Sequence, residues 1–141
     1  MKLVLFLFVT TGVFAQTGSA CLPYSVPVKL QGTITLVTFP GPPNYASVKD
    51  GDRAETNWVL HVKRPVCTVP QRDYMFSIAE SNVMSLQLIV DIGQLMKATP
   101  DVTQERSFLK VPVLVTGSLM HAETGHHHTK VMMIASRVER L

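Results

Sequence analysis

Regular alternation of apolar and polar residues is the feature that most constrains the fold of this chain. It is clearest over residues 26–39, where apolar residues stand at every second position from 26 to 36 with one interruption. Successive side chains of a strand point to opposite faces of a sheet, so this pattern predicts a long strand with one buried and one solvated face. Gly32 interrupts the run and predicts a bulge or a sharp bend. The residues expected on the buried face are Val26, Val28, Leu30, Ile34 and Leu36.

The same alternation predicts four further strands. The second contains Trp58 and ends at Pro65, the third covers residues 84–90, the fourth 111–119 and the fifth 131–138. Trp58 alternates with aliphatic residues, and this favours a place in the core over an exposed stacking platform. A glycine inside the fourth strand, Gly117, indicates a second bend.

A change of period between the third and fourth strands predicts one short helix. Apolar residues take helical spacing from Asp91 to Ala98, and Pro100 follows. The resulting order, β-β-β-α-β-β, is that of the OB-fold, a five-stranded and partly open Greek-key barrel. We therefore expect a mainly β, OB-like single domain over residues 21–141, a length that suits one hydrophobic core. Another small antiparallel α+β sandwich is the alternative.

The first 20 residues have the features of a secretory signal peptide. A basic residue is followed by an apolar run over residues 3–9 and by small residues that allow cleavage after Ala15 or, as second choice, after Ala20. The run is too short for a membrane span, which takes roughly 20 apolar residues. We expect an exported protein, periplasmic or secreted. Lipoprotein anchoring through Cys21 is a minor alternative, because Gly18 stands where such sites usually carry leucine.

The chain contains two cysteines, Cys21 and Cys67. An even number of cysteines in an exported protein is typical of disulfide bonding, so we predict one bond between them. In the chain-entropy account, a crosslink that closes a loop of this length stabilises the domain by roughly 4 kcal/mol.

Two loops have unusual sequences. The proline loop, Phe39–Tyr45, contains three prolines, which fix the backbone and lower the entropy cost of docking a ligand. The histidine loop, Thr124–Thr129, contains three successive histidines. In an OB-fold, the connections between strands one and two and between strands four and five flank one binding face. We therefore expect the two loops to approach each other. The candidate ligand-binding residues are Tyr45, Asp52, His126, His127 and His128.

The histidine loop also supports a weaker hypothesis of transition-metal binding. His126 and His128 can share one side of an extended segment, and the hairpin can bring back His121 from the end of the fourth strand. Three imidazoles would suit zinc or copper. Gly125, between these residues, is expected to supply a backbone conformation with φ > 0 to the turn.

Among functional classes, binding is favoured over catalysis. The chain has no nucleophile elbow, no zinc-protease motif and no glycine-rich phosphate loop, so we assign no catalytic residue and no certain cofactor. The net charge of +3 comes from scattered basic residues, which does not favour nucleic acid. We expect an exported binding module for a small molecule, a glycan or a protein, in preference to an enzyme, an inhibitor or a structural envelope component. The sequence does not fix the oligomeric state.

The two loop motifs, together with Gly51-Asp52, Trp58 and Pro65-Val66-Cys67, resemble an uncharacterised family of small exported bacterial proteins. That family is known only as a domain of unknown function. The resemblance extends from Cys21 to about Ile134 and implies an envelope or secreted protein with the same cysteine pair. It implies no activity, substrate or catalytic residue.

Overall fold

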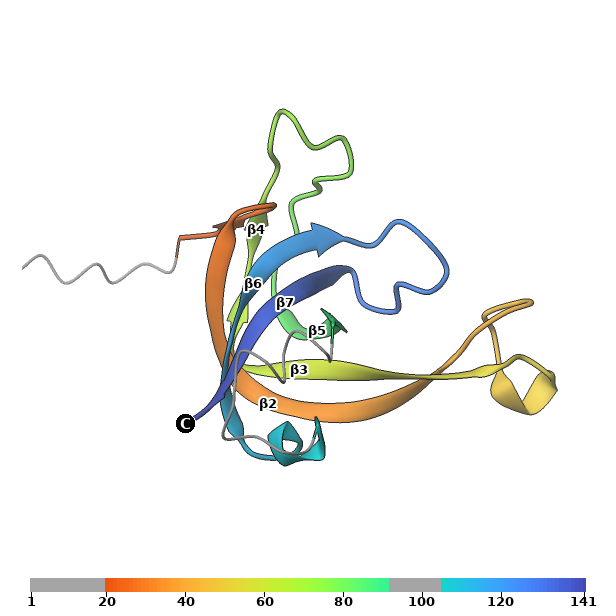
Figure 1. Ribbon diagram of the computed structural model, residues 1–141. Helices are drawn as coiled ribbons and strands as arrows, with labels where there is room; N and C mark the ends of the chain where they lie inside the picture. Colours follow the sequence, from red (N-terminus) through yellow and green to blue (C-terminus); the bar gives the residue numbers. More distant parts are fainter. Residues whose placement is uncertain (1–19, 92–104) are drawn as a thin grey trace, which may run out of the picture.

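The computed structural model describes residues 20–91 and 105–141 (Figure 1). The expected signal peptide, apart from Ala20, and the expected helix beyond Asp91 lie outside the described residues. Two 3-10 turns, η1 (Val48–Asp50) and η2 (Glu105–Phe108), are the helical elements of the described part. Within these residues, no helix is long and apolar enough to cross a membrane.

Five strands close into a barrel in the order β2-β3-β5-β7-β6. Only β5 and β7 run parallel to each other, and the other neighbours are antiparallel. The prediction of a mainly β, five-stranded barrel is confirmed. The strands are β2 (Pro27–Pro40), β3 (Ala54–Val66), β5 (Val83–Val90), β6 (Pro112–His121) and β7 (Val131–Arg140).

The barrel is closed, whereas the sequence led us to expect a partly open one. The reason is the length of β2, which has 14 residues and serves two neighbours. Its first half pairs with β6 from Pro27 to Thr33, and its second half pairs with β3 from Gly32 to Pro40. The change of partner occurs at Gly32, where a Cβ would lie 2.2 Å from the backbone oxygen of His61. Glycine permits this close approach.

The second predicted bend is also present. The register between β6 and β7 shifts between Thr116 and Gly117, as in a β-bulge. At Gly117 a Cβ would lie 2.2 Å from the backbone oxygen of Ile134, so the two strands approach more closely there than a side chain would permit.

The barrel interior is filled by aliphatic side chains and a few aromatic ones. Trp58 is buried, as expected, and its ring meets that of Phe108 edge-on at 6.4 Å between centroids. The largest fully buried side chains of this core are Tyr24, Phe108, Ile34, Leu60, Leu86, Leu119, Met133, Val113, Val115 and Val131.

Two residues of the predicted buried face are exposed, Val26 by 36% and Leu36 by 46%. Val26 precedes β2. Leu36 belongs to a two-stranded arm, formed by Leu36–Pro40 and Ala54–Trp58, in which the described part of the chain gives β2 and β3 no partner except each other. The arm extends away from the barrel (Figure 1), so its inner face is left partly solvated.

A disulfide joins Cys21 to Cys67, which confirms the predicted pairing. It lies beside a short parallel pair of strands, β1 (Leu22–Pro23) and β4 (Thr68–Val69). The backbone N–H of Leu22 donates to the Cys67 carbonyl at 2.7 Å. The bond therefore links the residue before β1 to the residue after β3.

Candidate functional site

The proline loop and the histidine loop meet at the arm, as expected from the topology. The Tyr45 hydroxyl lies 3.1 Å from Nε2 of His126. The ring of Phe39 stacks on that of His128, with centroids 4.4 Å apart and an angle of 4° between the planes. These contacts join segments about 80 residues apart in the chain.

Glu55, on β3, connects the two histidines. Its Oε1 lies 2.7 Å from Nδ1 of His126, and its Oε2 lies 3.0 Å from Nε2 of His128. A carboxylate only accepts hydrogen bonds, so both ring nitrogens donate. Nε2 of a neutral His126 ring is then an acceptor, and the Tyr45 hydroxyl donates to it. The hydrogen bond from His128, followed by that from His126, lowers the pKa of Glu55 below its usual value against the opposing effect of burial.

Gly125 has a different role from the one expected. It lacks a positive φ, and Gly51 is the glycine with one in the described part of the chain. A Cβ at Gly125 would instead lie 2.8 Å from Cζ of Tyr45. The glycine therefore makes room for the tyrosine ring. Tyr45 itself has the unusual backbone, with φ of 56°.

Asp52 lies inside the connection between β2 and β3 and holds its backbone. It is 6% exposed. Its Oδ1 accepts from the N–H of Asn44 at 2.8 Å, and its Oδ2 accepts from those of Ala46 and Ser47 at 2.7 and 2.9 Å. Backbone hydrogen bonds, the one from Ser47 first, lower the pKa of Asp52. The structure thus gives Asp52 a supporting role within the loop.

Gln87, on β5, holds the histidine loop against the outside of the barrel. The side chain is buried, with Nε2 donating to the His126 carbonyl at 3.1 Å and Oε1 accepting from the His128 N–H at 2.7 Å. Val59, Gln87 and Met132 are directly opposite one another on β3, β5 and β7. All three are buried, because the histidine loop folds back over this part of the sheet.

Beside this contact the surface is hollowed to a volume of about 470 Å³. The hollow lies between the arm, the ends of β5 and β7, and the histidine loop. His127 accepts the Glu123 N–H on Nδ1 at 2.9 Å, so Nε2 carries the proton of its neutral ring. Asn57 makes no side-chain hydrogen bond with the described part of the chain. The lining residues are Glu55, Thr56, Asn57, Gln87, Ile89, His126, His127 and Met132.

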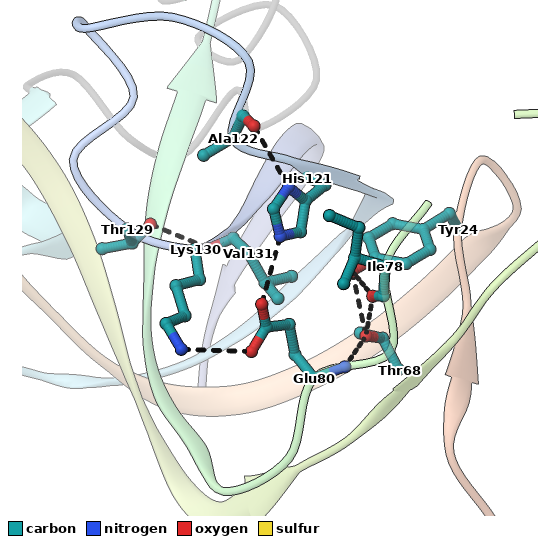
Figure 2. A network of polar contacts seen from close by, with 9 residues as sticks. All are labelled: Tyr24, Thr68, Ile78, Glu80, His121, Ala122, Thr129, Lys130 and Val131. Atoms are coloured by element: carbon teal, nitrogen blue, oxygen red, sulfur yellow. Dashed lines mark hydrogen bonds and ion pairs between the residues drawn. The ribbon is translucent and has the colours of Figure 1, made fainter. Parts of the chain in front are cut away.

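His121 lies in a separate polar network, shown in Figure 2. Its Nε2 faces Oε1 of Glu80 at 3.1 Å, and its Nδ1 faces the Ala122 carbonyl at 3.0 Å. Lys130 reaches the other oxygen of Glu80 at 3.5 Å. The hydrogen bond from His121 is the main cause that lowers the pKa of Glu80. Tyr24 packs edge-on against the His121 ring at 6.5 Å.

The structure therefore brings together His126 and His128 of the expected metal ligands, and places His121 elsewhere. The described residues contain no group of three or more His, Cys, Asp or Glu side chains arranged to hold a metal ion. The two histidines are held by one carboxylate instead.

Sequence reasoning missed Glu55 and Gln87 as partners of the histidine loop. Both occupy polar positions in alternating strands, where a solvated side chain is the ordinary expectation. Alternation along β3 places Glu55 on the same face as Asn57 and Val59. This face is partly covered only because the histidine loop folds against it, which the strand pattern does not predict.

Comparison with known families gives a match over part of the chain. Residues 85–139 match the model of a domain of unknown function, DUF4431. The matched segment contains β6, the histidine loop and most of β5 and β7, whereas the proline loop and the arm lie outside it. Comparisons with curated proteins and with solved structures found no match.

Proposed function

We propose that this domain is an exported binding module whose ligand occupies the hollow between the arm and the histidine loop. The observation that carries the proposal is the hollow itself. It is bordered by the arm and the histidine loop, which are connected by hydrogen bonds of Tyr45 and Glu55 with His126 and His128. Binding sites are typically concave and combine apolar walls with a few placed polar groups. Ile89 supplies an apolar wall here, and Asn57 and His127 supply polar groups.

The loops around the hollow are already ordered without a ligand, and this also supports binding. A ligand that enters the hollow meets loops already held by Asp52, Gln87 and Glu55, so little ordering of the protein opposes its association. Export is supported by the disulfide, since such bonds persist in oxidising compartments. Binding is proposed in preference to catalysis because the sequence contains no recognised catalytic motif.

The experiment is a screen of neutral, hydrogen-bonding fragments against ¹⁵N-labelled protein. We expect the amide chemical shifts of Glu55, Asn57, Ile89 and His127 to change on binding. The changes should become weaker in Asn57→Leu, which keeps the branched shape of the side chain and removes its amide. Gln31→Leu, which removes an exposed side-chain amide outside the hollow, is the matched control and should bind as the parent does. Shifts scattered over the surface, or unchanged in Asn57→Leu, would contradict the proposal.

A further inference from the structure

The arm leaves one edge of β3 without a neighbouring strand in the described part of the chain. The β3–β5 register includes Val59↔Gln87, Leu60↔Leu86 and His61↔Ser85, and on the arm side of Val59 it has no further pair. In contrast, β2 stays paired with β3 to the end, at Pro40↔Ala54. The hollow lies where β3 and β5 separate, since it is lined by residues 55–57 of one strand and by Gln87 and Ile89 of the other.

The direction of the backbone groups on this edge follows from the alternation of an antiparallel ladder. The N–H of Gln87 donates to Oγ1 of Thr129 at 2.8 Å, so it points away from β3. Val59, opposite Gln87, therefore directs its groups toward β2, and every second residue does the same. Thr56, at an intervening position, directs its N–H and C=O toward the open side.

From this edge we infer that the ligand of the hollow is an extended peptide segment, which adds to β3 as a further strand over Ala54–Trp58. The inference rests on the proposed binding function and names its ligand class. Unpaired strand edges bind extended chains through main-chain hydrogen bonds, and side-chain pockets beside the edge give specificity. Here the Asn57 amide and the Ile89 side chain, 39% exposed, would contact the added strand.

A positive charge at the end of this edge of β3 favours peptides that carry an acidic side chain. Arg53 directly precedes β3 and is exposed, and its guanidinium forms no ion pair within the described residues. The neighbouring carboxylate, Glu55, already receives two imidazole donors. An acidic side chain of the peptide would pair with Arg53, about 14 Å along the strand from the residue opposite Asn57.

The test begins with selection of binders from an mRNA-displayed library of random decapeptides, followed by calorimetry with one selected peptide. Thr56→Pro removes the outward N–H, whereas Thr56→Ala removes only a hydroxyl that bonds Thr38 and keeps the N–H. We expect Thr56→Pro to weaken binding about fivefold to tenfold and Thr56→Ala less than twofold. Arg53→Glu should weaken binding of acidic peptides about tenfold.

A second measurement keeps the inference testable if Thr56→Pro fails to fold. Peptides N-methylated at single backbone positions are titrated into the parent protein, and alternate positions should lose affinity. Equal loss at all positions, equal binding to the two Thr56 variants, or a library without binders would overturn the peptide inference. If fragments still bind the hollow in those cases, the proposed binding function stands, and if they do not, both are overturned.

Discussion

Asp52 illustrates how one carboxylate can set the shape of a loop. It accepts three backbone N–H groups from Asn44, Ala46 and Ser47. Asp52→Ala leaves these donors without a partner, and we expect their amide hydrogens to exchange roughly tenfold faster while core amides stay unchanged. Hydrogen exchange followed by NMR checks this. Uniform acceleration over the whole domain would show that Asp52 supports global stability instead.

The same residue predicts a pH dependence. The pKa of Asp52 is lowered in the folded protein, so its stabilising effect is complete above the ordinary aspartate value of about 3.9 and is lost as pH falls through the folded value. We expect protection of the Ala46 and Ser47 amides to fall in acid, below pH about 4, and to be independent of pH in Asp52→Asn. A transition centred near neutral pH would contradict this.

Gly125 predicts a steric effect, because its missing side chain gives the Tyr45 ring its place. Gly125→Ala should displace the ring and break the Tyr45–His126 hydrogen bond. The chemical shifts of the His126 ring report the loss, and the β6–β7 register should be unchanged. Tyr45→Leu combined with Gly125→Ala should add little to either single change, since both remove one contact.

At the scale of elements, the two loops show which contacts can be predicted from alternation and topology and which cannot. The strands follow from period-two patterns, and the approach of the proline and histidine loops follows from the OB-like arrangement expected for those strands. The pairing of Glu55 with two histidines does not, because it depends on how Gln87 fixes the loop backbone. We expected a three-histidine metal site because the hairpin could bring His121 back to the histidine loop. In the structure the His121 ring instead forms a hydrogen bond with Glu80, from another loop.

The bulge in β6 gives the sharpest prediction for an element. A Cβ at Gly117 would lie 2.2 Å from the Ile134 carbonyl, a backbone atom that cannot rotate away. Gly117→Ala should therefore destabilise the domain by about 1–3 kcal/mol, the usual cost of overpacking. Urea denaturation measures it. Gly51→Ala, at a glycine with open space around it, is the comparison that separates steric overlap from φ strain.

For the histidine loop we predict weak metal binding. Zinc or copper would have to displace the bonds of His126 and His128 to Glu55, and this competition opposes coordination. Calorimetric titration of tag-free protein should show no micromolar site. A tight site lost in the variant His126→Ala/His128→Ala would reverse this conclusion.

At the scale of the whole molecule, the disulfide is the main covalent constraint. Cys21 and Cys67 are 46 residues apart, and their bond links the residue before β1 to the residue after β3. We expect Cys21→Ser/Cys67→Ser to lower the free energy of unfolding by about 3–4 kcal/mol. Urea denaturation of the variant beside the oxidised parent checks the value. A loss below about 1 kcal/mol would mean that the short β1–β4 pairing holds this corner without the bond.

The closed barrel has a consequence for the order of assembly during synthesis. β7 lies between β5 and β6, so both of these strands lack a neighbour until the last ten residues of the barrel have been made. The pairing of β2 with β6 likewise joins residues more than 75 positions apart. Closing such distant pairs is slow, and the barrel cannot close before β7 has been synthesised. Passage across a membrane as an unfolded chain would then require no unfolding step.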